Sequence, residues 1–168
     1  MRLNVSMALA NPGQSYPFEA DIQIPPMEVL DDPVSFENVH GTGEFMGSGN
    51  AVTVRTHIEG KVTSRCALCL EPVTQDISCE ADALFTPDAK EGDDEYPLEG
   101  YQVDLMPYAR EALLLELPMR FLCSEDCKGL CPVCGVNRNT TRCSCQEKEG
   151  KPNPFAALSE LRIQDEEV

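Results

Sequence analysis

Apolar and polar residues alternate along much of the first half of the chain, the pattern of β-strands with one buried face and one exposed face. The clearest run covers residues 52–59, where Val52, Val54 and Ile58 share one face and charged residues occupy the other. Further strands are expected at residues 5–9, 18–24, 34–36, 44–46 and 73–85. Because antiparallel sheets with one solvated face produce this alternation, the sequence predicts an antiparallel sheet of about five or six strands.

After these strands the spacing of the apolar residues changes from two positions to three or four, which predicts one long helix. Over residues 105–117 the apolar residues recur every three or four positions, the spacing of one helical face. Asp104 is expected to cap the first turn, and Pro107 falls where a missing N–H has no cost. Pro118 is expected to end the helix. Its second half is apolar on most sides, so we expect the helix to be buried against the sheet.

Two further segments have a clear composition. Residues 87–100 carry six carboxylates against Lys90 alone and are expected to form a solvated loop. A short C-terminal helix is expected from Pro154, with Asn153 as its cap. Its apolar face would consist of Phe155, Leu158 and Leu161.

Eight of the nine cysteines form four short pairs, with one to three residues between the members of each pair. The pairs are Cys66 and Cys69, Cys123 and Cys127, Cys131 and Cys134, and Cys143 and Cys145. Such spacings bring two sulfurs to one side of a tight turn, as a tetrahedral Zn²⁺ ion bound by four thiolates requires. The sequence therefore predicts two zinc sites of four thiolates each. The ninth cysteine, Cys79, falls in a predicted strand and is expected to be an inert core thiol.

The pairing of the ligands follows from their separation along the chain. Only eight residues separate Cys134 from Cys143, so the last two pairs are assigned to one ion and the first two pairs to the other. Gly135, directly after a knuckle, is expected to adopt a positive φ. An exchange of Cys127 with Cys131, or one occupied site beside four free thiols, remains as an alternative. Iron in a four-thiolate site and redox-active cysteine pairs are alternatives to zinc.

The N-terminal sequence predicts a reducing compartment, in which these cysteines are expected to bind metal. Residues 1–10 contain no apolar run long enough for a secretory signal, and no segment approaches the ~20 apolar residues of a membrane span. We therefore expect a cytoplasmic protein. Clustered cysteines in a reducing compartment bind metal more often than they form disulfides, and an odd number of cysteines fits poorly with complete pairing.

The net charge of −16 is distributed unevenly. Residues 118–152 contain six positive and four negative side chains, so the rest of the chain carries −18. Such a surface attracts basic partners and repels phosphate backbones at long range.

Contact with RNA would therefore use the region of the second cysteine cluster. The candidate contact residues are Arg120, Lys128, Asn137, Arg138, Asn139 and Arg142. No aromatic residue lies between Lys128 and Gly150, so a base-stacking platform is missing and recognition of shape or phosphate is left open.

Nothing in the sequence indicates catalysis. A catalytic zinc keeps an open position and usually has a histidine ligand, but His40 and His57 lie on predicted strands away from the cysteine turns. There is no Ser/His/Asp constellation, phosphate-binding loop or nucleotide-binding fingerprint, and the carboxylates are dispersed. We therefore expect a protein without enzymatic activity.

Together these elements predict an α+β fold. It consists of an antiparallel β-sheet with one long buried helix, a cysteine-rich zinc-knuckle lobe at about residues 120–147, and a short C-terminal helix. Residues 1–168 are expected to form a single domain.

Several motifs resemble the bacterial YceD family and occur in the same order as in that family. The segment Leu117–Cys145 carries the later cysteine pattern, Ser64–Val73 carries the Cys-x-x-Cys-Leu hairpin, and Lys151–Leu158 resembles the C-terminal motif. These blocks span most of residues 65–161, whereas the first sixty residues match only in a general strand pattern.

The resemblance implies a role in the accumulation of large-subunit ribosomal RNA, and so a non-enzymatic factor in ribosome assembly. The expected partners are a basic ribosomal protein, precursor large-subunit rRNA, or both; charge favours the protein. No membrane and no small-molecule substrate is expected. The alternative function is a zinc–thiol redox sensor or redox-regulated chaperone, in which oxidation ejects zinc and exposes apolar surface. The negative charge disfavours a DNA-binding zinc ribbon.

Overall fold

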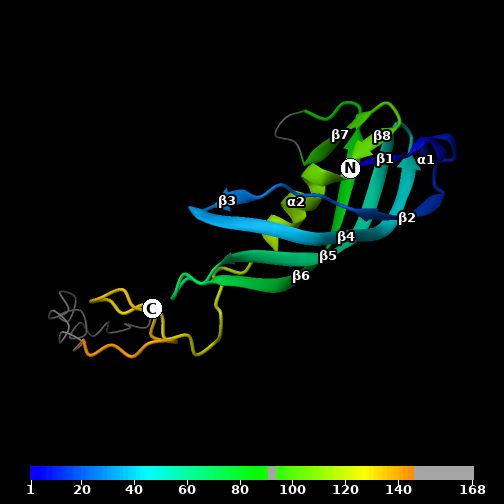
Figure 1. Ribbon diagram of the computed structural model, residues 1–168. Helices are drawn as coiled ribbons and strands as arrows, with labels where there is room; N and C mark the ends of the chain where they lie inside the picture. The colour runs from blue at the N-terminus through cyan, green and yellow to red at the C-terminus, as the bar shows by residue number, and fades with distance from the viewer. Residues whose placement is uncertain (91–93, 146–168) are drawn as a thin grey trace, which may run out of the picture.

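The computed structural model describes residues 1–90 and 94–145, which form one curved sheet, two short helices and a lobe at one end of the sheet (Figure 1). The elements in chain order are β1 (Arg2–Asn4), α1 (Ser6–Ala10), β2 (Ser15–Asp21), β3 (Met27–Val29), β4 (Asp32–Ser48), β5 (Ala51–Arg65), β6 (Pro72–Thr86), β7 (Glu95–Glu99), β8 (Gln102–Asp104) and α2 (Leu105–Leu115).

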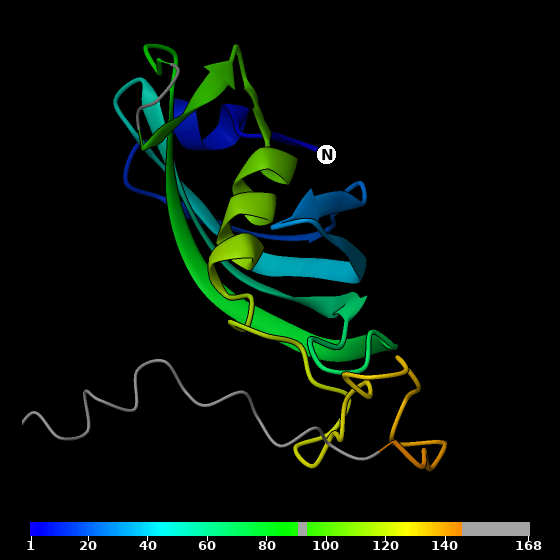
Figure 2. The ribbon, with the colours of Figure 1, turned by 90° about the vertical axis from the view of Figure 1, so that its left-hand side faces the viewer.

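The sheet is built around three long antiparallel strands, β4, β5 and β6. The strand order is β1-β8-β7-β6-β5-β4-β2, and β3 pairs with the beginning of β4. All of these pairs are antiparallel except that of β6 with β7, which is parallel. The sheet curls into a half-barrel, and α2 lies in its hollow (Figure 2).

The core fills the space between the hollow of the sheet and α2. Val52, Val54 and Ile58 of β5 are fully buried, as their alternation predicts, and α2 contributes Leu105 and Leu113. The start of α2 is also as predicted, because the Asp104 carboxylate accepts a hydrogen bond of 3.0 Å from the backbone N–H of Met106. No helix among the described residues is long and apolar enough to cross a membrane.

The predicted fold class, an α+β sheet with one long helix, is wrong. Strands dominate the described residues, and the two helices found there have only five and eleven residues. The two short strands predicted at residues 34–36 and 44–46 belong to one strand of 17 residues, β4, whose length the sequence pattern did not predict. A register shift between Glu37 and His40 bends this strand. At Gly43, a Cβ atom would clash with the Arg55 carbonyl, so only glycine permits the close approach of β4 to β5.

Two smaller expectations also fail. Residues 5–9 were expected to form a strand, but Ser6–Ala10 is helix α1, which packs against β4. Val5 and Ala8, three positions apart, are both fully buried, and α1 approaches so closely that a Cβ atom at Gly47 would clash with Ala8. Within the acidic segment 87–100, Glu95–Glu99 forms β7 instead of a loop, because Leu98 is buried in the core. The C-terminal helix expected from Pro154 lies outside the described residues.

Candidate metal centres

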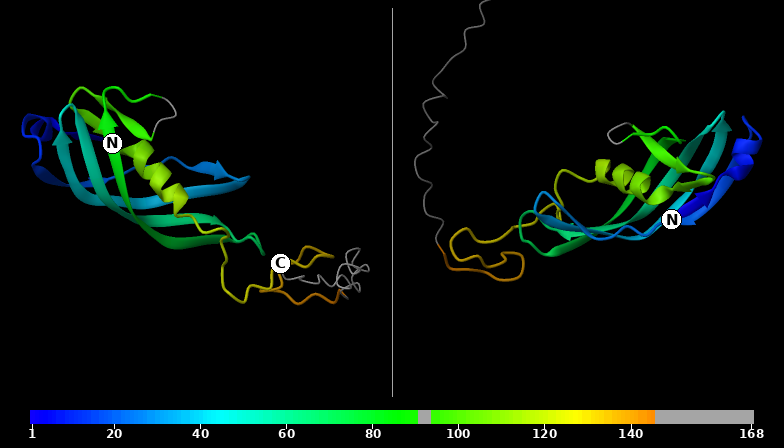
Figure 3. Two further views of the ribbon diagram at one scale, coloured as in Figure 1. Left: turned by 180° about the vertical axis from the view of Figure 1, so that it is seen from behind. Right: turned by 90° about the horizontal axis from the view of Figure 1, so that it is seen from above.

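The candidate sites lie at the end of the sheet where β5 and β6 meet. We call the described residues 122–145 the cysteine lobe, and residues 1–65, 72–90 and 94–121 the sheet body. The lobe lies beyond the tip of the β5–β6 hairpin and outside the curved sheet, as the views from behind and from above show (Figure 3). Residues 66–71 form the hairpin tip and connect the two parts.

The first cluster contains Cys66 and Cys69 from the hairpin tip together with Cys123 and Cys127 from the lobe. Their four Sγ atoms lie within 4.8 Å of one another. The Sγ atoms of Cys66 and Cys127 are 3.8 Å apart, and those of Cys69 and Cys123 are 3.6 Å apart. A disulfide would need about 2.05 Å, whereas tetrahedral coordination at about 2.3 Å per Zn–S bond separates the sulfurs by roughly 3.8 Å. These distances fit a site that could hold a metal ion through four thiolates.

Backbone hydrogen bonds hold the hairpin tip in the form that this cluster needs. The N–H of Cys66 donates to the carbonyl of Glu71 at 2.8 Å, and the N–H of Leu70 donates to the carbonyl of Cys66 at 2.9 Å. Leu70 adopts a left-handed conformation with φ 63°. The tip also bonds to the chain that enters the lobe, since the N–H of Ala67 donates to the carbonyl of Phe121 at 2.8 Å. The first cluster therefore joins the lobe to the sheet body.

The second cluster lies wholly within the lobe. Its members are Cys131, Cys134, Cys143 and Cys145, whose Sγ atoms also lie within 4.8 Å of one another. Gly135 has φ 73°, as expected, and its N–H donates to the carbonyl of Cys131 at 2.8 Å. The turn thereby directs backbone N–H groups toward the Cys131 sulfur, which is the usual neutralising shell of a thiolate-bound metal.

The structure brings together the same two sets of four cysteines that the spacing suggested. Cys127 lies in the first set and Cys131 in the second, so these two cysteines are not exchanged. All nine cysteines are free thiols. Each set offers four sulfur ligands and could hold a metal ion. Cys79 belongs to neither set and lies half-buried at the edge of the core, where burial raises the pKa of its thiol.

The pKa values within each set depart from the ordinary thiol value in opposite directions. Burial opposes ionisation of Cys66, but backbone hydrogen bonds from Cys69, Cys123 and Leu68 outweigh it and lower the pKa of Cys66 to about 6. Backbone hydrogen bonds from Cys134 and Val133 lower the pKa of Cys131 to about 6. In the same set, the neighbouring Cys134 sulfur raises the pKa of Cys145 to about 12. Like charges cannot accumulate on four adjacent sulfurs without a cation to neutralise them.

The two sets differ in exposure. Cys66 and Cys69 are 0% and 4% exposed, Cys127 is half-buried, and Cys123 is exposed. In the second set only Cys131 is buried; Cys134 is exposed, and Cys143 and Cys145 are half-buried. Each set therefore has one exposed thiol, but the first set has two buried thiols and the second only one.

Neither histidine belongs to a ligand cluster among the described residues. The Nδ1 atom of His40 lies 2.8 Å from a carboxylate oxygen of Asp21, and this hydrogen bond raises the pKa of the histidine. His57 is exposed on β5.

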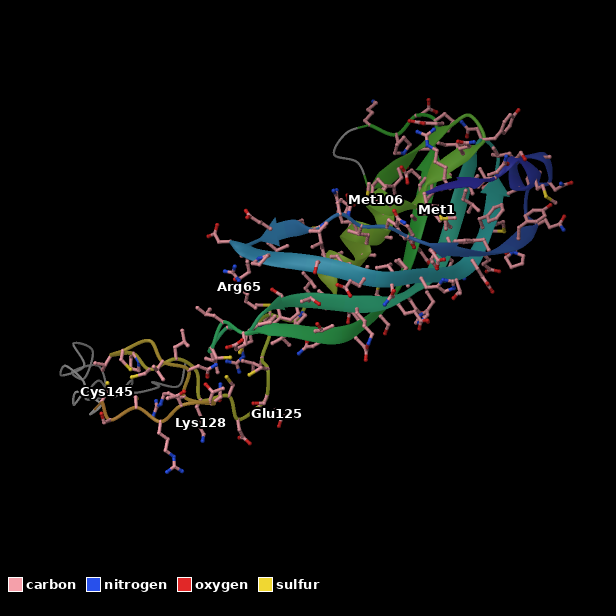
Figure 4. All side chains as sticks on the ribbon, viewed as in Figure 1. Met1, Arg65, Met106, Glu125, Lys128 and Cys145 are labelled. Carbon is pink, nitrogen blue, oxygen red and sulfur yellow. The ribbon has the colours of Figure 1, made fainter. Side chains whose placement is uncertain are left out.

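The candidate RNA-contact residues fall into three groups. Lys128, Arg138 and Arg142 line a cavity of about 260 Å³ beside the second cysteine cluster, together with Thr141. Arg120 lies apart from them, in a separate groove that it shares with Arg65. Figure 4 shows Lys128 within the lobe and Arg65 at the end of the sheet.

The two asparagines, by contrast, stabilise the lobe. Asn139 accepts a hydrogen bond of 2.8 Å from the N–H of Lys128 through Oδ1, and its Nδ2 donates to the Cys127 sulfur at 3.3 Å. Asn137 donates to the carboxylate of Glu71 at 3.3 Å, which connects the lobe to the hairpin tip. One sign of this role was visible in the sequence: the Asn-x-Asn spacing between two cysteine pairs suits side-chain hydrogen bonds to nearby backbone.

Ion pairing also distinguishes the two parts. Four cations of the sheet body pair with carboxylates: Arg2 with Glu99, Arg55 with Asp82, Lys61 with Asp76, and Arg110 with Glu111. Lys128 and Arg142 of the lobe form no ion pair with a carboxylate within the described ranges. The same holds for two cations of the sheet body, Arg65 and Arg120, which lie next to the hairpin tip and the lobe. Sequence reasoning missed this difference, because pairing depends on which strands lie side by side.

Comparison with known proteins places both cysteine clusters inside one matched region. The family profile "Large ribosomal RNA subunit accumulation protein YceD" matches residues 54–162. Two relatives named as chloroplastic YCED homolog 1 are similar: the Arabidopsis thaliana protein is 28% identical over 56% of this chain, and the Zea mays protein 27% identical over 60%. The chain spans only 34% and 44% of their lengths.

A bacterial relative matches over nearly the whole length. Protein YlbN of Bacillus subtilis is 28% identical, and the match covers 93% of each chain. No solved structure matches the chain significantly. Since the family profile covers well over half of the sequence, including all eight clustered cysteines, the chain belongs to the YceD family.

Proposed function

We propose that this chain is a non-enzymatic, cytoplasmic factor in ribosome assembly that supports the accumulation of large-subunit rRNA. Membership of the YceD family supports the process, because relatives are named for accumulation of the large ribosomal RNA subunit. The structural observation that carries the proposal is the division of the molecule into an acidic sheet body and a lobe in which Lys128 and Arg142 have no carboxylate partner among the described residues.

Two Zn²⁺ ions are part of this proposal. One would be held by Cys66, Cys69, Cys123 and Cys127, and the other by Cys131, Cys134, Cys143 and Cys145. Four thiolates at tetrahedral distances suit zinc, and such closed sites are structural. When bound, each ion supplies a cross-link: the first fixes the lobe to the β5–β6 hairpin, and the second closes the lobe on itself.

The sheet body would contact a basic ribosomal protein. The solvent-exposed residues of β2, β4, β5 and β6 include nine carboxylates and only three Lys or Arg residues, Arg55, Lys61 and Arg65. The carboxylates are Glu19, Asp21, Asp32, Glu37, Glu44, Glu59, Asp76, Glu80 and Asp82. This excess would attract a cationic protein and shield it until it meets RNA. Precursor rRNA would be contacted at the lobe.

The test is made in cells whose only copy of the gene can be depleted. Depletion should lower the ratio of large-subunit to small-subunit rRNA, and the tagged protein should sediment with immature large-subunit particles. A variant that carries Cys69→Ser and Cys134→Ser should fail to restore the ratio, whereas Cys79→Ser should restore it. An unchanged rRNA ratio on depletion would contradict the proposal.

A zinc–thiol redox sensor is the second candidate, and the exposure of the second cluster favours it. Two thiolates could give two electrons to a peroxide and form one disulfide, while the peroxide takes up two protons and leaves as two water molecules. The zinc ion, deprived of two ligands, would be released. If mild peroxide releases zinc and switches on the binding of unfolded proteins, this function replaces the first.

A further inference from the structure

We propose that Lys128, Arg138 and Arg142 form a seat for the phosphodiester backbone of RNA, and that the second cysteine cluster holds this seat in shape. The inference rests on the proposed rRNA partner and gives it a binding site and a mode of recognition. Three observations carry it: the cavity, the loop that presents the cations, and the lack of a stacking surface.

The cavity brings together cations that are separated in sequence. Its volume is about 260 Å³, and Lys128, Arg138, Arg142 and Thr141 line it together with Pro132, Val133 and three cysteines of the second cluster. All three cations are exposed, and Lys128 and Arg142 have no carboxylate partner in the described part of the chain. In a chain of net charge −16 with cations paired across its sheet, such a grouping favours an external anion.

The second cluster fixes the positions of these cations. Arg138 and Arg142 lie in the loop between Cys134 and Cys143, so both ends of the loop are tied to the same four sulfurs. The N–H of Arg138 donates to the carbonyl of Gly129 at 2.9 Å, which holds the loop beside Lys128. Within the loop, the N–H of Thr141 donates to the carbonyl of Asn137 at 3.0 Å. A preformed seat loses little conformational entropy when an anion binds.

The chemistry of the seat suits phosphate groups, and the described lobe offers no aromatic platform for bases. Guanidinium groups match phosphate oxygens through paired N–H donors. Residues 122–145 contain no aromatic side chain on which a base could stack. Four thiolates on one Zn²⁺ carry a net charge of −2, which offsets about two of the three cations. Binding at this seat is therefore weak, independent of sequence and sensitive to salt.

The test measures the binding of a labelled single-stranded RNA of ~20 nucleotides to the zinc-loaded full chain by fluorescence anisotropy over a range of salt concentrations. One RNA has a large-subunit rRNA sequence, and the other is a scrambled version. Arg142→Gln should weaken binding about two- to fivefold and lower the slope of log K against log salt concentration by about one. Lys128→Gln combined with Arg142→Gln should weaken binding about tenfold.

Arg55→Gln is the matched control, because it removes the same charge from an exposed arginine of the sheet body. It should change RNA binding less than twofold. Cys134→Ser should weaken binding as much as the double variant, whereas the scrambled RNA should bind the wild type as well as the rRNA sequence does. A measured zinc content of two ions per chain in Arg142→Gln would show that the lobe of this variant is still folded.

Two results would overturn the proposal that these cations bind the RNA backbone. One is equal RNA affinity of the wild type and the double variant. The other is the absence of any RNA binding by a wild-type protein that still sediments with immature large-subunit particles, which would leave the proposed function standing. Binding that does not weaken with salt would contradict recognition through phosphates.

Discussion

The sheet body and the cysteine lobe are stabilised in different ways. The body encloses 24 buried apolar residues in one continuous core. Within residues 122–145 only Gly129 and Cys131 are buried, and the small cluster at the hairpin tip contains only Cys66, Cys69 and Val73. So short a segment cannot fold through hydrophobic burial, so a cross-link has to take its place. The comparison explains why eight cysteines are concentrated at one end of the chain.

The difference extends to the use of charge. On the body, Arg55 lies between Glu44 and Asp82 in the register of β4, β5 and β6, and it pairs with Asp82 at 3.1 Å. On the lobe, Lys128 and Arg142 line a cavity without a carboxylate partner among the described residues. Arg2, Arg55, Lys61 and Arg110 of the body have carboxylate partners, whereas Lys128 and Arg142 of the lobe have none in the described part of the chain.

Removal of metal should give the largest effect, and it should be confined to the lobe. Structural zinc contributes on the order of 10–16 kcal/mol to the folding of isolated zinc-binding peptides, and nothing else in the lobe can replace it. A strong chelator should abolish hydrogen-exchange protection of backbone amides in residues 122–145, while the centres of β4, β5 and β6 keep theirs. Simultaneous loss of protection in both parts would show that the body depends on the metal.

Single cysteine variants serve as controls for the chelator. Cys69→Ser and Cys134→Ser should each reduce the zinc content from two ions per chain to one, measured by mass spectrometry. Cys79→Ser should leave two, because Cys79 lies at the edge of the core and outside both clusters.

The reverse perturbation, in the core of the body, should give the second largest effect. Phe85 is fully buried, and its ring centroid lies 5.4 Å from that of Tyr96 and 6.2 Å from that of Tyr108. Phe85→Ala should lower the free energy of unfolding by about 3–5 kcal/mol in urea titration, because it leaves a cavity. The zinc content should stay at two, with Phe85→Leu as the milder control. Loss of zinc in the alanine variant would mean that the two parts are not independent.

The sequence predicts those elements of the fold whose pattern is local. The alternation over residues 52–59 and the cap at Asp104 correspond to β5 and α2, because each pattern is complete within one element. Prediction from the sequence fails where a contact with a distant part of the chain determines the secondary structure. Ser6–Ala10 is helical and not extended because Val5, just before the helix, and Ala8 both reach the core. The acidic segment forms β7 because β6 offers a free edge to Glu95–Glu99.

The cysteine sets could also be predicted, because short spacing along the chain brings two sulfurs together regardless of the fold. Assembly of the first set from Cys66 and Cys127, 61 residues apart, followed only by elimination from the second set. The Asn-x-Asn spacing suggested hydrogen bonds to nearby groups, but it did not predict that Asn139 donates to the Cys127 sulfur. Nor could the sequence predict that Lys128 has no carboxylate partner among the described residues, since both depend on how the lobe folds back on itself.

Asn139 allows the link between the lobe and the first cluster to be tested by a smaller change. Its hydrogen bond to the Cys127 sulfur is the main cause of the lowered pKa of that thiol. Asn139→Ala should keep two zinc ions but lower the affinity of the first site about tenfold, the usual scale for loss of a hydrogen bond to a metal ligand. Competition with a chromogenic chelator would measure it. Thr140→Ala is the control: it removes a hydrogen bond of 3.3 Å to the Asn137 carbonyl but none to a sulfur, so it should leave the affinity unchanged.

The smallest expected effect is a difference in unfolding midpoint between two variants. One removes Arg55, a paired cation of the body, and the other removes Arg142, a lobe cation with no carboxylate partner among the described residues. Arg55→Ala removes an exposed ion pair, so its unfolding midpoint in urea should fall slightly at low salt. The shift should vanish near 1 M salt, where the screening length is about 3 Å. Arg142→Ala removes no such pair, so its midpoint should equal that of the wild type at every salt concentration. If Arg142→Ala instead releases zinc or lowers the midpoint, then Arg142 neutralises the second cluster. The lobe would then resemble the body in satisfying its own charges, and its cations would not be held for a partner.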